Sequence, residues 1–224
     1  MIDDILFADK PKGITSFDVI RILRKKLGVW KMGHAGTLDP LASGLMILGV
    51  NGGTKKMSEF LKLPKIYVAD ILLGKKSNTG DLEGKIIEEK STNHITEEMI
   101  HSVIDCFAGK HSLSVPMYSA IKVGGNTLYS IARKKEAGKV LTEKEINTVP
   151  PIKEMEVLFA ELLNIERTEN KIILKVKIEV SSGSYIRTLA EEIGNRLGTS
   201  AMLTSLRRIQ IGKYTVEDVG IIRL

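Results

Sequence analysis

A glycine-rich stretch that leads into an apolar run constrains this chain more than any other feature. Residues 33–45 read Gly-His-Ala-Gly-Thr-Leu-Asp-Pro-Leu-Ala-Ser-Gly-Leu. The glycines permit backbone angles that other residues avoid and allow a second molecule to approach closely. Pro40 disfavours helical angles at Asp39, and residues 45–50 are apolar, which predicts a buried strand. We therefore expect Asp39 on a tight loop beside a rigid apolar strand.

Two interpretations of Asp39 fit this pattern. Loops on a rigid scaffold often carry catalytic or binding residues. An Asp-Pro turn with no further role explains the same residues. On local chemistry alone the structural turn is the simpler interpretation.

Composition indicates an ordinary globular protein. The chain has 224 residues, of which 43% are hydrophobic and 27% charged, enough for one large domain or two small ones. Its single cysteine, Cys106, excludes an internal disulfide and fits a reducing compartment. The apolar helical pattern around Cys106 predicts a buried side chain. Because the N-terminus lacks a signal-peptide pattern and no apolar run approaches the length of a membrane span, we expect a cytoplasmic protein.

The charge distribution suggests a polyanionic partner. Lysine and arginine number 33 against 27 acidic residues, which gives a net charge of +6. A solvated face explains any one basic cluster, but three clusters flanking the glycine-rich segments predict a charged groove. These clusters are Arg21, Arg24, Lys25, Lys26 and Lys31; Arg133, Lys134, Lys135 and Lys139; and Arg207, Arg208 and Lys213.

Strand and helix signals alternate along the chain, which predicts one α/β-type domain around a mixed sheet. Residues 65–74 show little polar alternation and are expected as a central strand. The other expected strands cover residues 5–8, 45–50, 85–89, 116–123, 154–167, 172–180 and 208–214. The expected helices cover residues 16–27, 96–107, 128–135, 184–197 and 199–206, with one more starting at Thr54 and turning Met57, Phe60 and Leu61 inward. Ser16 and Ser184 are the expected caps of their helices.

Two further features stand out. Residues 124–149 are polar and rich in lysine in their second half and end before Pro150-Pro151, which predicts an inserted lobe. Trp30 precedes the glycine-rich loop. Its side chain either stacks on a nucleobase or packs in the core, and packing is the simpler interpretation.

Common catalytic motifs are missing from the sequence. The four histidines lack metal-ligand spacing, and there is no Gly-x-Ser-x-Gly motif, P-loop or dinucleotide fingerprint. Arg187 lies in the first turn of an expected helix, where a cation opposes the helix dipole. An arginine held near Asp39 would lower the pKa of that carboxyl and orient it bidentately.

Four further segments accompany residues 33–45. In chain order they are Asp-Lys-Pro-Lys-Gly-Ile-Thr-Ser at 9–16, Lys-Ile-Tyr at 65–67 through Gly-Asp at 80–81, Pro-Met-Tyr-Ser-Ala-Ile-Lys at 116–122, and Gly-Ser-Tyr-Ile-Arg-Thr-Leu at 183–189 with Leu-Arg-Arg at 206–208. Together the five segments resemble the bacterial TruB-type tRNA pseudouridine-55 synthase family. Residues 33–45 resemble its catalytic motif, and the resemblance extends over nearly the whole chain.

The resemblance implies an α+β pseudouridine synthase fold, in which helices flank a mixed, mostly antiparallel sheet and residues 124–149 form a thumb lobe. It also implies an enzyme that isomerises a uridine, expected at position 55 in the T loop of tRNA, to pseudouridine. The target base is flipped out of the stacked loop. Such an enzyme needs no cofactor and no metal, binds the T stem-loop and is expected to be a monomer.

The resemblance also assigns roles to six residues. Asp39 matches the essential aspartate, which acts on the ribose by attack at C1′ or by removal of the 2′ proton. Tyr67 matches the tyrosine that stacks on the base and is a candidate for the final C5 deprotonation, and Arg187 matches the arginine that pairs with the aspartate. The remaining residues are implied in substrate binding: Leu206 as an apolar wall of the pocket, His34 in the gap left by the flipped base, and Tyr185 as a nucleotide contact.

The chain departs from the family pattern at two places. Val115 stands where the first of two adjacent prolines is expected, and the chain ends at Leu224, where family members commonly continue into an RNA-binding domain of the PUA type. The resemblance therefore predicts one catalytic domain over residues 1–224, without that second domain in this chain. An alternative function is a tRNA-folding chaperone that binds the T arm, with modification secondary. A third interpretation, another aspartate-nucleophile hydrolase, is disfavoured because no second acidic residue accompanies Asp39 in the sequence.

Overall fold

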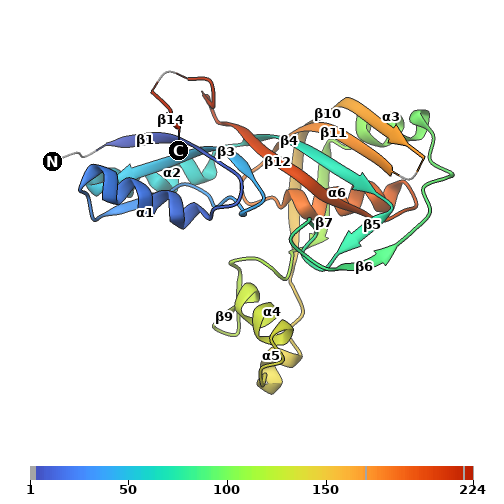
Figure 1. The fold of residues 1–224 in the computed structure, drawn as a ribbon, viewed down its shortest axis with the longest axis horizontal. Coiled ribbons are helices and arrows are strands. Elements are labelled where there is room, and N and C mark those ends of the chain that lie inside the picture. The colour runs from blue at the N-terminus through green and yellow to red at the C-terminus, as the bar shows by residue number, and fades with distance from the viewer. Residues whose placement is uncertain (1–3, 170, 219, 224) are drawn as a thin grey trace.

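One ten-stranded sheet runs through the molecule in the computed structural model, which describes residues 4–169, 171–218 and 220–223 (Figure 1). The strand order is β14-β1-β3-β12-β4-β11-β10-β7, with β2 paired to β3 and β13 paired to β12. Within this sheet β1–β14 and β3–β12 are parallel and the other pairs are antiparallel. The expected mixed, mostly antiparallel sheet is therefore confirmed. The ten strands are β1 (Ile5–Lys10), β2 (Met32–His34), β3 (Ser43–Val50), β4 (Lys65–Leu73), β7 (Gly109–Ser114), β10 (Ile152–Thr168), β11 (Lys171–Val180), β12 (Ala201–Ile211), β13 (Tyr214–Thr215) and β14 (Ile222–Arg223).

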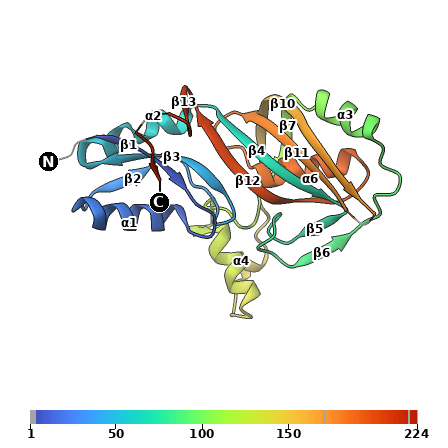
Figure 2. The same ribbon diagram turned by 45° about the horizontal axis from the view of Figure 1, so that its top comes forward.

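Helices flank the sheet, and a small lobe projects from one long side of the molecule (Figures 1 and 2). The lobe, residues 124–149, is called the thumb lobe below. The helices are α1 (Ser16–Leu27), the 3-10 helix η1 (Asn51–Lys56), α2 (Met57–Lys62), α3 (Glu97–Asp105), α4 (Leu128–Glu136), α5 (Glu143–Ile146) and α6 (Ile186–Arg196). Two short hairpins complete the fold: β5 (Lys75–Ser77) with β6 (Ile86–Glu89), and β8 (Lys122–Val123) with β9 (Asn126–Thr127).

Strand β3 is buried along its whole length, which confirms the strand expected at residues 45–50. Successive side chains of a strand point to opposite faces. Met46 and Leu48 join the larger hydrophobic cluster, with α1 residues, while Leu45 and Ile47 join a smaller one. A strand covered on both faces has no polar alternation, which explains the continuous apolar run.

Strand β4 is central, as expected, because it pairs with β11 on one side and β12 on the other. Strand β12 in turn meets β3, where Arg208 pairs with Gly44. The approach is so close that a Cβ at Gly44 would lie 2.2 Å from the Arg208 carbonyl oxygen, and the φ of Gly44 is +107°. Gly44 is thus required for the contact between β3, the strand that follows the Asp39 loop, and β12.

Two expected elements are wrong. Residues 199–206 do not form a helix, because Ala201–Ile211 is strand β12, whose backbone pairs with both β4 and β3. Partners distant in sequence decide this segment over its local preference. Residues 116–123 are not a strand, apart from the short β8, because the Tyr118 carbonyl accepts a hydrogen bond from Arg187 instead of a neighbouring strand.

Several side chains also differ from expectation. Trp30 does not pack in the core but is 89% exposed, and Leu61 and Cys106 are exposed as well. Helix α1 is capped by Thr15, because the Ser16 hydroxyl bonds to Leu38 instead. At α6 the N-cap is Tyr185, with no side-chain cap, and Ser184 does not fill that role.

Membrane insertion through a helix finds no support in the described residues. None of their helices has both the length and the apolar character needed to cross a bilayer.

Replacement of Gly44 tests the close contact between β3 and β12. Gly44→Ala should destabilise the fold by about 3–5 kcal/mol, since it combines a strained positive φ with a clash against backbone. Gly125→Ala is the matched control, because Gly125 has a φ of +89° but open space around it. We expect the control to cost only about 1–2 kcal/mol of strain. If urea denaturation shows the same loss of unfolding free energy for Gly44→Ala and Gly125→Ala, the predicted clash at Gly44 is contradicted.

Candidate active site

The loop that carries Asp39 is held through its backbone by the segment that follows β1. The Ser16 hydroxyl donates to the Leu38 carbonyl at 3.0 Å and accepts from the Leu38 N–H at 2.8 Å. The Gly13 N–H donates to the Pro40 carbonyl at 2.8 Å. Since the residues on both sides of Asp39 are tied to residues 13–16, the direction of the Asp39 side chain is set by this backbone clamp.

Lys10 organises the turn that provides the clamp. Its side chain is fully buried, and its ammonium group donates to the carbonyls of Ile14 at 2.6 Å, Pro11 at 3.0 Å and Pro40 at 3.4 Å. Burial lowers the pKa of Lys10 to about 8, while the negative charge of Asp39 opposes that shift. The ammonium form therefore still predominates at neutral pH and places a cation behind the Asp39 loop.

Arg187 forms an ion pair with Asp39. The Arg187 Nε lies 3.1 Å from Asp39 Oδ2, and the arginine side chain is only 7% exposed. Its Nη1 donates to the Thr79 carbonyl at 2.8 Å and its Nη2 to the Tyr118 carbonyl at 2.9 Å. The bidentate fork expected from the sequence is therefore turned toward backbone oxygens, and the carboxylate is paired through Nε.

A second carboxylate, Asp81, lies beside the same guanidinium. Its Oδ2 is 3.9 Å from Arg187 Nε, and its side chain is only 2% exposed. Its Oδ1 accepts from the Thr79 hydroxyl at 2.6 Å and from the Glu83 N–H at 3.0 Å. The expectation that no second acidic residue accompanies Asp39 holds within the motif but is wrong for the folded chain. In the sequence, Asp81 belongs to a segment that resembles the family, but nothing there placed it beside Arg187.

The surroundings of Asp39 have opposing effects on its pKa. Burial raises the pKa of Asp39, the cation of Arg187 lowers it, the charge of Asp81 raises it further and Lys10 lowers it. The net direction is upward from the ordinary value. The side chain nevertheless keeps 37% of its surface open to solvent, so a substrate can reach it.

Tyr67 and Leu206 lie on adjacent central strands. Leu206 of β12 pairs with Ala69 of β4, two residues from Tyr67, and residues directly opposite in a pair share one face of a sheet. Both side chains are buried and belong to the same hydrophobic cluster as Leu38, the residue before Asp39. The two side chains therefore lie on the same face of the central sheet, within the core to which Leu38 also belongs.

His34 and Tyr185 lie at the ends of elements around the site. His34 is the last residue of β2, where burial and the nearby Arg208 cation lower its pKa. Tyr185 is the N-cap of α6, two residues before Arg187. Burial raises the pKa of Tyr185, and the charges of Arg187 and Asp39 both act on it. Of the two residues, Tyr185 is the one whose electrostatics link it to the ion pair.

Tyr118 connects the site to the thumb lobe. Its carbonyl accepts from Arg187, its hydroxyl donates to Glu136 of α4 at 3.3 Å, and the Asn78 amide donates to that hydroxyl at 3.4 Å. The position of α4 is therefore linked to the Arg187 side chain through one residue.

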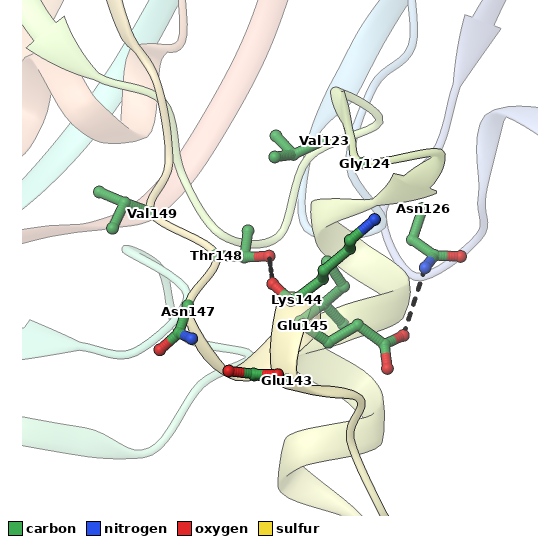
Figure 3. A pocket seen from close by; sticks show the side chains of 10 residues that line it. Val123, Gly124, Asn126, Glu143, Lys144, Glu145, Asn147, Thr148 and Val149 are labelled. Carbon is green, nitrogen blue, oxygen red and sulfur yellow. Dashed lines mark hydrogen bonds between the residues drawn. The ribbon is translucent and has the colours of Figure 1, made fainter.

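The thumb lobe has its own buried carboxylate and a hollow of about 540 Å³ (Figure 3). Glu145 lines the hollow and accepts from Lys134 at 2.6 Å and from the Thr142 N–H at 2.8 Å. The hydrogen bonds from Lys134 and Thr142 lower the pKa of Glu145 to about 2. Residues of β8, β9, α4 and α5 and of the segment after α5 line this hollow, so it is separate from the Asp39 site.

Nowhere among the described residues do three His, Cys, Asp or Glu side chains gather closely enough to hold a metal ion.

The fold is that of the pseudouridine synthases. Superposition on a solved chain in a "Cbf5-Nop10-Gar1 Complex" gives a TM-score of 0.71 at 27% identity and covers 98% of this chain. A chain of an "H/ACA RNP bound to a substrate RNA containing 2'-deoxyuridine" gives 0.68 at 25% identity, again over 98% of this chain. The present chain spans about half the length of these solved chains, at 52% and 50%.

Sequence comparison identifies the family within that class. The model of the "TruB family pseudouridylate synthase (N terminal domain)" matches residues 24–186. A protein called tRNA pseudouridine synthase B from Endomicrobium trichonymphae is 40% identical over 217 residues, covering 97% of this chain and 88% of that protein. The protein of the same name from Thermotoga maritima is 40% identical over 214 residues, covering 96% and 64%. The chain therefore belongs to the TruB family of pseudouridylate synthases, and the expected enzyme class, an RNA-modifying isomerase, is confirmed.

The electrostatics of the ion pair predict the pH dependence of pseudouridine formation. If the reaction needs ionised Asp39, its single-turnover rate falls as the pH drops through a pKa that lies above the ordinary value of 3.8. Arg187→Gln removes the cation that lowers this pKa, so the acid limb should move to higher pH. Arg196→Gln, at the other end of α6, should leave the limb in place. An acid limb that does not move in Arg187→Gln would contradict the coupling.

Proposed function

We propose that this chain converts a uridine in the T loop of tRNA, at position 55, to pseudouridine. One observation carries the proposal: an aspartate on a clamped loop is paired with a buried arginine. The relatives named tRNA pseudouridine synthase B support tRNA as the substrate. A nucleotide that stays stacked in a folded RNA loop cannot bring its ribose to a carboxylate that is only partly exposed. The reacting base must therefore leave its stack.

In the proposed reaction Asp39 acts on the ribose of the flipped uridine. The bond between N1 and C1′ breaks, the uracil rotates, and a bond forms between C5 and C1′. The proton on C5 is then removed and N1 gains a proton, so the product is an isomer with no net oxidation. Asp39 promotes the first step in one of two ways, and both require its ionised form. It attacks C1′ as the bond to N1 breaks, and the resulting ester is displaced when C5 bonds to C1′. Alternatively it takes the 2′ proton as the bond to N1 breaks, and returns that proton to C2′ when C5 bonds to C1′.

Arg187 holds the Asp39 carboxylate in its charged form and in one orientation. The arginine is itself fixed, since its other nitrogens donate to the Thr79 and Tyr118 carbonyls. A donor held in this way needs little reorganisation when charge moves during the reaction.

The neighbouring residues have binding roles in this proposal. Tyr67 stacks on the flipped uracil and is the candidate for removing the C5 proton, while Leu206 forms the apolar wall on which the base rests. His34 occupies the gap that the base leaves in the loop, and Tyr185 contacts a further nucleotide. The thumb lobe closes on the RNA, whose splayed loop and backbone are recognised by shape and charge.

Replacement of Asp39 separates catalysis from binding. Asp39→Asn keeps the shape but removes the negative charge, so tritium release from tRNA labelled at C5 of uridine should fall below about one thousandth of the wild-type rate. Filter binding should show tRNA affinity close to wild type. Asp105→Asn, at the exposed end of α3, is the matched control and should release tritium normally.

Unchanged tritium release by Asp39→Asn would contradict the catalytic role of this residue. If the wild-type protein binds tRNA but releases no tritium at all, the result would instead favour a chaperone that only binds the T arm.

A further inference from the structure

Trp30 is exposed without a structural reason. It is the only tryptophan of the chain, and 89% of its surface is open to solvent. It lies between the end of α1 and the start of β2, in the segment that leads to His34. A large aromatic side chain in this position contributes little to folding, so a contact with another molecule is the better explanation of its placement.

Helix α1, which ends before Trp30, carries a second exposed aromatic ring and an arginine. Phe17 of α1 is 59% exposed, and the Arg24 guanidinium lies 5.9 Å from the centre of its ring. Phe17 and Arg24 are seven residues apart, so they lie on the same face of α1. Arg24 also donates to the Met32 carbonyl at 3.1 Å, which places this face of α1 against β2.

The surface around these residues is positively charged. Lys25 lies in the last turn of α1 and Lys31 follows Trp30, and neither forms an ion pair in the described part of the chain. The nearby Asp18 is paired with Arg21 at 2.7 Å, so those two charges offset each other. The name Trp30 patch is used below for Phe17, Arg24, Lys25, Trp30 and Lys31.

The patch lies at the far end of the elements that lead to the active site. Met32, two residues after Trp30, pairs with Val50 at the end of β3, whereas the Asp39 loop joins the start of that strand. Helix α1 lies on the side of the molecule from which the thumb lobe projects (Figures 1 and 2). An RNA bound at Asp39 must therefore extend about 23 Å, the length of the eight-residue strand β3, to reach the patch.

We propose that the Trp30 patch is a second RNA-contact site, which binds unpaired nucleotides of the same RNA whose uridine enters the Asp39 site. A nucleobase stacks on the indole of Trp30, and the adjacent phosphates lie against Lys25 and Lys31. Exposed aromatic side chains within a basic surface are the usual arrangement for binding single-stranded RNA. Arginine beside an aromatic ring adds a surface on which a base can also stack. The inference rests on the proposed function, since it names where that same substrate extends.

The single tryptophan makes the proposal directly measurable. The full chain is titrated with an unmodified tRNA transcript and with an isolated T stem-loop RNA, and Trp30 emission is followed. Stacking should quench the emission and protect Trp30 from acrylamide, with a midpoint equal to that of filter binding on the same RNA. Emission and acrylamide quenching that stay unchanged at saturating RNA would overturn the proposal, whatever else the patch binds.

Affinity measurements complete the test. Trp30→Ala should weaken binding of the RNA about tenfold, and Trp30→Phe should restore most of the loss because it retains a ring. Leu163→Ala, an exposed apolar residue of β10, is the control and should bind as wild type. If Trp30→Ala binds the RNA with wild-type affinity, the proposal is overturned even if RNA changes the Trp30 emission of the wild-type chain.

The outcomes are distinct from those of the proposed function. If the wild-type chain forms pseudouridine but its Trp30 emission does not respond to RNA, only the proposal of a second contact site is refuted. If the wild-type chain forms no pseudouridine in any tRNA, the proposed function itself is refuted.

Discussion

The hydrogen bonds between Ser16 and the backbone of Leu38 are the constraint on which the site depends. Together with the bond from the Gly13 N–H to the Pro40 carbonyl, they fix the peptide on both sides of Asp39. A carboxylate at the tip of a glycine-rich loop would otherwise sample many directions, since glycine permits a wide range of backbone angles. The clamp explains why a turn distant from the motif in sequence belongs to the same site. It also explains why Ser16 does not cap its own helix, a role that falls to Thr15.

Arg187 joins the clamped loop to two other segments. Its three nitrogens reach Asp39, the loop before Asp81 and the segment that leads to the thumb lobe. The guanidinium is almost fully buried, and a buried charge is stable only when it is paired and hydrogen-bonded. The position of the Asp39 carboxylate, the turn at residues 79–81 and the path of Tyr118 are therefore interdependent. Because Tyr118 also bonds to Glu136 of α4, Arg187 and the thumb lobe share this residue as a hydrogen-bond partner.

Local patterns in the sequence were enough to predict the buried strand at residues 45–50, the central strand β4 and the loop position of Asp39. Each depends on burial or on glycine and proline chemistry within a few residues. The strand β12 could not be predicted locally, because its backbone is completed by β3 and β4, which lie far away in the chain. The approach of Asp81 to Arg187 and the double hydrogen bond of Ser16 were hidden for the same reason. Trp30 shows the opposite limit, since the apolar character of a residue does not say whether it faces the core or solvent.

The clamp itself can be tested through the rate of the chemical step. Ser16→Ala leaves Asp39 and Arg187 unchanged but removes both hydrogen bonds to Leu38, so pseudouridine formation is measured under single-turnover conditions at saturating tRNA. A misplaced reactive group costs up to about 100-fold in rate, and we predict a loss of at least about tenfold, with thermal unfolding confirming that the variant is folded. Ser205→Ala, which removes only the hydroxyl that bonds to Lys12 at 2.9 Å, serves as the comparison. A folded Ser16→Ala protein that reacts at the wild-type rate would contradict the claim that this clamp positions Asp39.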